Sequence, residues 1–217
     1  PSITGAILSL EIMSAVDAHD NGATEKSTVA SEIVKKEWAA DIISRLKIAP
    51  VIEGRFIQKE KLVSVPKPFE CEGFFIFWKD DVLLWKATKP ILTTSLYTDQ
   101  NFKTYIHLNG KRIENTSPSA TNIVNRILWG LLSADMTALE LDFQIFSQNR
   151  QESWKMDFYP KSNMTGSIVK HVSVTGKDAP EKIVVENFSS DITTLIIDEI
   201  KLSEISSTQQ ENELANP

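Results

Sequence analysis

The segment Gly73-Phe-Phe-Ile-Phe-Trp-Lys-Asp-Asp-Val-Leu-Leu-Trp-Lys-Ala-Thr-Lys-Pro90 decides the fold of this chain. Two aromatic and apolar runs stand on either side of the polar turn Lys79-Asp80-Asp81. This arrangement predicts a β-hairpin that carries a large apolar surface. Pro90 cannot donate a hydrogen bond inside a central strand, and we therefore expect the second strand to end near it.

Segments on both sides of the hairpin predict further antiparallel strands. Trp154, Met156 and Phe158 alternate with polar residues, which is typical of a strand with one buried face. The dipeptide Asn109-Gly110 predicts a second tight hairpin. The predicted strands cover residues 55–61, 69–78, 82–86, 91–98, 102–108, 143–148, 153–159, 168–175, 182–188 and 193–200, with another that begins at 112.

Two segments have helical periodicity instead. In Ser31–Leu46 and Pro118–Ala134, apolar residues recur three and four positions apart. Strands with two helical interruptions predict an α+β protein with a long antiparallel sheet. Such a sheet can curl into an incomplete barrel that helices cover, while composition alone leaves a sandwich or a closed barrel equally open.

Composition excludes several classes of protein. A chain of 217 residues is expected to form one domain of ordinary size. A net charge of −6 argues against nucleic-acid binding, which needs clustered Lys and Arg. Cys71 is the single cysteine, so no intrachain disulfide can form, and we expect it to be a small buried hydrophobe. No apolar run is long enough for a transmembrane helix.

The residues that catalysis or metal binding would need are scattered. His19, His107 and His171 are the only histidines, and they lie in a predicted loop and two different predicted strands. No metal-ligand spacing, nucleophile elbow or glycine-rich phosphate loop is present. We therefore expect no catalytic residues, no metal and no cofactor, and predict that the protein is not an enzyme.

The two ends of the chain differ from the middle. Residues 1–24 are interpreted either as the remnant of a signal peptide, with Val16 and Ala18 at its cleavage site, or as a flexible or helical N-terminus. Residues 25–202 are expected to form the folded domain, and residues 203–217 a polar C-terminal tail.

Three segments together resemble the outer-membrane lipoprotein carrier (LolA-like) family of bacterial periplasmic proteins, as a divergent member. The first is the hairpin, with Gly73, Lys79, Leu83-Leu84, Trp85, Thr88 and Pro90 at the family's positions. The other two are Phe56-Ile-Gln-Lys59 and Trp154-Lys-Met-Asp-Phe-Tyr-Pro160. The resemblance implies a curved antiparallel sheet that forms an incomplete (half) β-barrel, with helices covering a concave, apolar cavity.

The resemblance also implies a function. It predicts a soluble periplasmic carrier that binds the acyl chains of a lipoprotein or an envelope lipid and takes them from the inner towards the outer membrane. Its partners would be this acylated cargo, an inner-membrane exporter and an outer-membrane acceptor, and the carrier itself would be a monomer. The alternative is a non-catalytic periplasmic scaffold that binds proteins and has the same fold with a filled core.

The implied cavity residues follow from the family's positions and from strand alternation. They are Phe75, Phe77, Leu83, Trp85, Ile127, Leu131, Trp154, Met156 and Phe158. Lys79 stands where the family's lipoprotein carrier has an arginine that holds the helical lid closed, and we treat it as a candidate lid latch. Lysine lacks the planar fork of arginine, so it is expected to hold a lid less firmly.

Overall fold

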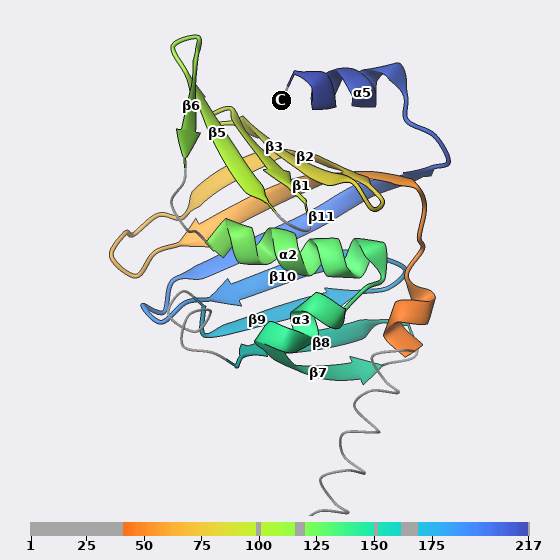
Figure 1. Cartoon of the computed structure of the whole chain (residues 1–217). Coiled ribbons are helices and arrows are strands. Elements are labelled where there is room, and N and C mark those ends of the chain that lie inside the picture. Colours follow the sequence, from red (N-terminus) through yellow and green to blue (C-terminus); the bar gives the residue numbers. More distant parts are fainter. Residues whose placement is uncertain (1–40, 99–100, 116–119, 150–151, 162–168, 217) are drawn as a thin grey trace, which may run out of the picture.

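The computed structural model describes residues 41–98, 101–115, 120–149, 152–161 and 169–216 (Figure 1). These residues form one open sheet of 11 antiparallel strands in the order β6-β5-β4-β3-β2-β1-β11-β10-β9-β8-β7. The strands are β1 (Val51–Lys61), β2 (Phe69–Trp78), β3 (Val82–Lys89), β4 (Thr93–Tyr97), β5 (Phe102–Leu108), β6 (Lys111–Asn115), β7 (Phe143–Asn149), β8 (Trp154–Pro160), β9 (His171–Gly176), β10 (Pro180–Glu186) and β11 (Ile192–Ser203). The prediction of an α+β fold with an unclosed antiparallel sheet is confirmed.

The first and last strands meet at the centre of the sheet. β1 pairs with β11 along its whole length, from Val51 opposite Ser203 to Lys61 opposite Ile192. This pairing joins the meander β1–β6 to the meander β7–β11. A continuous surface on one face of the sheet is therefore built from both halves of the chain.

The β2–β3 hairpin has the register that places its aromatic residues on alternating faces. Phe75 lies opposite Trp85 and Phe77 opposite Leu83. A Cβ on Gly73 would come within 2.0 Å of the Lys86 carbonyl oxygen, so only glycine fits where the two strands approach. The predicted hairpin is confirmed.

Helices cover the concave face of the sheet (Figure 1). α2 (Ala120–Ser133) lies in front of the sheet and runs nearly parallel to β10 in Figure 1, and α3 (Thr137–Asp142) follows it. α2 buries Ile127, Leu128 and Leu131 in the main hydrophobic cluster, together with residues of both meanders. Residues 41–45 are also helical, and Ile42 and Leu46 join the same cluster. The predicted place of the second helix is confirmed, whereas residues 31–40 of the first lie outside the described ranges.

A second, smaller apolar cluster lies on the convex face. It consists of Val51, Ile76, Trp78, Val82 and Leu84, and Leu214 packs against it. Leu214 belongs to α5 (Thr208–Ala215), a helix that begins with a capping box formed by Ser207 and Gln210. The polar tail thus contains a helix that the sequence analysis does not expect.

Candidate binding groove

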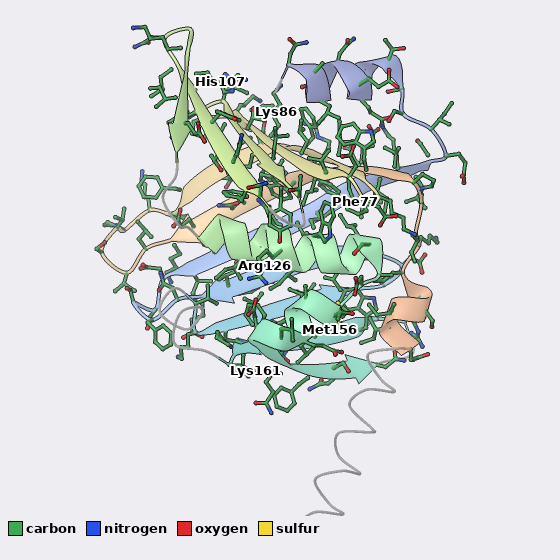
Figure 2. All side chains as sticks on the ribbon, viewed as in Figure 1. Phe77, Lys86, His107, Arg126, Met156 and Lys161 are labelled. Carbon is green, nitrogen blue, oxygen red and sulfur yellow. The ribbon has the colours of Figure 1, made fainter. Side chains whose placement is uncertain are left out.

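The nine residues that the family resemblance places in a cavity all belong to the main hydrophobic cluster. Figure 2 shows two of them, Phe77 on the upper strands and Met156 on the lower strands, with α2 between. Their side chains are almost completely buried, from 0% exposed for Phe75 to 4% for Trp85. Most of them therefore fill the core rather than line an open space, and their role as lipid contacts stays a prediction.

Aromatic stacking makes the upper part of this core rigid. The Trp85 ring stacks on Phe56, with ring centroids 3.9 Å apart, and lies parallel to Phe75 at 5.8 Å. Trp129 of α2 meets Phe77 edge-on at 5.2 Å. Stacked and edge-on pairs of this kind add to the free energy gained by burial. The Trp129–Phe77 pair joins α2 to β2.

Beyond Trp85, the concave face opens into a groove of about 380 Å³. We call it the concave groove. It runs over β1–β5, and its apolar lining consists of Trp85, Ala87, Cys71, Ile106, Pro90, Ile91 and Phe69. Phe69 and Ile91 are exposed, so they mark the outer end of the groove. Trp85 belongs to both the groove and the core, which makes it the boundary between them.

Short polar residues explain why the groove is present. Thr93, Ser95 and Thr104 occupy concave positions of β4 and β5. In the row of Ser95 and Thr104, β3 and β2 carry the aromatic residues Trp85 and Phe75 instead. The smaller volume of the serine and threonine side chains leaves space that the neighbouring strands fill. The Ser95 and Thr104 hydroxyls lie 2.9 Å apart in a hydrogen bond. These three residues were not predicted from the sequence as part of a site. Small polar residues among apolar ones on a single face of the strands would have indicated the groove.

The outer end of the groove is electrically negative. Glu60 and Glu70 are the charged residues among those that line it in the described part of the chain. Burial, followed by the charges of Glu60 and Glu70, raises the pKa of the Cys71 thiol above its ordinary value. A thiol with a raised pKa is a poor nucleophile at neutral pH. The half-buried Cys71 is therefore part of the groove wall.

A smaller cavity of about 210 Å³ lies at the other end of α2. Leu46, Ile52, Leu131 and Leu202 supply part of its apolar lining. Lys47 closes one side through an ion pair with Asp178, with a distance of 2.6 Å between nitrogen and oxygen. Leu131 is the one predicted cavity residue found here.

The candidate latch Lys79 lies in the exposed turn between β2 and β3. Its backbone N–H donates a hydrogen bond to the Pro50 carbonyl oxygen at 2.9 Å. Within the described ranges, no hydrogen bond joins its ammonium group to a helix. A role for Lys79 as a latch stays a prediction.

The described residues offer neither a metal cluster nor a membrane-spanning helix. No group of three or more His, Cys, Asp or Glu side chains gathers there with a geometry that could hold a metal ion. Across the same ranges, none of the helices combines the length and the apolarity needed to span a bilayer.

No family of known proteins and no curated protein matches the sequence. Among solved structures, the chain is similar to a LolA superfamily protein from Nitrosomonas europaea, with 9% identity, a TM-score of 0.44, and coverage of 77% of this chain and 94% of that one. It is also similar to a DUF1329 family protein from Desulfovibrio piger, with 7% identity, a TM-score of 0.47 and coverage of 80% and 94%. A third is a proposed outer membrane lipoprotein-sorting protein domain from Vibrio parahaemolyticus, with 10% identity, a TM-score of 0.44 and coverage of 82% and 96%.

Proposed function

We propose that this protein is a non-enzymatic carrier that binds the acyl chain of a lipid or lipoprotein in the concave groove. In this role it would act in the periplasm and carry its cargo from the inner towards the outer membrane. The observation that carries the proposal is the apolar groove, which continues from solvent to the aromatic core at Trp85.

The size and lining of the groove suit such a ligand. A volume of about 380 Å³ lies within the range of small-molecule sites, roughly 300–1,000 Å³. Each methylene that leaves water for an apolar lining contributes about 0.8 kcal/mol. Ten methylenes would thus contribute about 8 kcal/mol before the entropic cost of binding, enough for useful but reversible affinity. A carrier needs both properties because it must also release its cargo.

The second candidate is a scaffold domain that binds proteins on the same fold. The observation that favours it is the almost complete burial of the nine predicted cavity residues, which is the filled core that this alternative requires. The two candidates differ in what the groove holds, since the carrier loads acyl chains and the scaffold does not.

The test places the same charge on each face of the sheet. Ile106→Glu introduces a carboxylate into the concave groove, where it should lower affinity for a fluorescent acyl probe at least tenfold because the charge must be desolvated beside hydrocarbon. The matched control is Ile196→Glu on β11, since Ile196 is already 40% exposed and does not line the groove. We expect the control to bind as the wild type does.

Cys71 gives an independent measurement without any substitution. As the only cysteine, and a groove-lining one, it should react more slowly with a maleimide when an acyl chain occupies the groove. Native mass spectrometry of protein purified from cells without detergent would identify any bound species. Unchanged labelling with every acyl ligand, together with no bound lipid, would leave the scaffold as the function.

A further inference from the structure

Asn125 of α2 is a polar residue that is completely buried in the core. Its side chain is 0% exposed, and neither its amide nitrogen nor its amide oxygen has a hydrogen-bond partner among the described residues. A buried amide without partners is strongly unfavourable. Such a group points to a ligand that supplies both an acceptor and a donor.

The position of Asn125 follows from its neighbours on α2. Trp129 lies one turn later on the same side of the helix and packs against Phe77 and Tyr97. Farther along, Leu131 and Leu132 share a cavity with Ile52, which pairs with Phe77. The C-terminal half of α2 therefore lies over the row of strand residues that contains Phe77.

One turn back along α2 leads towards the row of strand residues at the inner end of the concave groove. Four residues of helix span about 6 Å, close to the roughly 6.6 Å covered by two residues of strand. Asn125 is therefore level with the next row, in which Trp85 pairs with Ser95 and Ser95 with Thr104. These three residues line the inner end of the groove. Ser95 and Thr104, which are 3% and 9% exposed, supply buried hydroxyl groups in that row.

We propose that Asn125, Ser95 and Thr104 form a polar subsite for the uncharged head of a single-chain lipid that enters the concave groove head first. The head must both donate and accept hydrogen bonds, as a primary amide does. An anionic head is disfavoured because no Lys, Arg or His side chain lines the groove in the described part of the chain, and Glu60 and Glu70 at its outer end are acidic. The acyl chain then lies along Ala87 and Ile106 towards the exposed Phe69.

This inference rests on the proposed function and narrows its cargo. A lipid whose head is a protein chain cannot enter head first, so a free lipid is expected rather than an acylated protein. The subsite also explains why a costly amide is kept in the core, since the head of the ligand would satisfy it in the loaded state.

The experiment compares four probes that share one chain length: dodecanamide, dodecanoate, dodecane and a dodecanoyl tetrapeptide amide. Binding is measured as protection of Cys71 from a maleimide. For the wild type we expect dodecanamide to protect Cys71 at a concentration about tenfold lower than the other three probes need. One or two ordinary hydrogen bonds account for this ratio of concentrations. Asn125→Leu should abolish this ratio and raise the midpoint of thermal unfolding, because an unpaired amide leaves the core.

A second variant protects the test against a misfolded Asn125→Leu. Ser95→Ala combined with Thr104→Val removes both partners of one buried hydrogen bond, which is nearly neutral for stability, and it should also reduce the ratio. The control Asn212→Leu, on the exposed side of α5, should leave the ratio unchanged. Equal protection by all four probes, or a ratio that survives in both groove variants, would overturn the subsite while leaving the carrier in place. If no probe protects the wild type, the proposed function itself fails.

Discussion

At the scale of single residues, the two faces of β2 and β3 account for the unusual apolar content of the hairpin. Phe75 and Phe77 enter the main cluster, whereas Ile76 and Trp78 enter the convex one. Alternation along a strand makes this division predictable from sequence. The depth to which each of these side chains is buried was not predictable from the sequence, because it depends on how far α2 extends over each strand.

Leu83 illustrates the consequence. It is 0% exposed, so Leu83→Glu should place an unpaired charge in the core and lower the free energy of unfolding by about 3 kcal/mol or more. Denaturant unfolding followed by circular dichroism measures this loss. The control is Leu108→Glu at a residue 44% exposed in the same sheet, where a change within about 0.5 kcal/mol is expected. An equal effect at both positions would contradict the burial of Leu83.

At the scale of elements, α5 is the least expected part of the structure. Three polar contacts hold α5 and the residues just before it to the convex face. Trp78 Nε1 donates to Ser206 Oγ at 2.5 Å, Lys86 pairs with Glu213 at 2.5 Å, and Gln210 Nε2 donates to Glu53 at 3.0 Å. The side chains of Lys86 and Glu213 are only 15% and 27% exposed, so this ion pair is better shielded than most surface pairs.

The sequence did contain a signal for α5. The spacing of Ser207 and Gln210 is that of a capping box, which marks the beginning of a helix even where few apolar residues follow. The contacts that hold α5 join residues more than 120 positions apart, and no local pattern predicts such pairing.

Removing α5 should therefore uncover the convex cluster. A chain that ends at Ile205 is expected to lose about 2 kcal/mol of stability, because it lacks the partly buried Leu214 and the three polar contacts. It should also bind more of a dye that fluoresces on apolar surface. Leu214→Ser should show part of this effect, and Asn212→Ser, at an exposed position of the same helix, none. Unchanged dye binding by the truncated chain would mean that α5 does not shield Trp78.

At the scale of the whole molecule, the local meanders were predictable but their assembly was not. Hairpins such as the one at Asn109-Gly110, where both residues have positive φ angles of 51° and 73°, follow from turn chemistry. The pairing of β1 with β11 joins segments some 140 residues apart by number, and no turn signal encodes it. The main hydrophobic cluster depends on this assembly, since it combines residues of both meanders with residues of α2.

The assembled sheet also predicts sensitivity to acid. Burial favours the neutral form of Asp157, but hydrogen bonds from Lys155, His171 and Ser173 outweigh it and lower the pKa of this carboxyl below its ordinary value of 3.8. A lowered pKa means that the folded state favours the ionised form. The stabilisation is therefore fully present above pH 3.8 and is lost as the pH falls through the folded-state pKa.

The variant Asp157→Asn tests this dependence of stability on pH. At neutral pH the variant should be less stable than the wild type by about 1–2 kcal/mol, because the charge that holds Lys155 and His171 is gone. The difference should shrink as the pH falls through the lowered pKa of Asp157 in the folded state, because the wild-type carboxyl then also becomes neutral. Thermal unfolding between neutral and acidic pH measures both curves, with Asp81→Asn in the exposed hairpin turn as the control. A gap between wild type and Asp157→Asn that stays constant across the pH range would show that packing, rather than charge, makes Asp157 important.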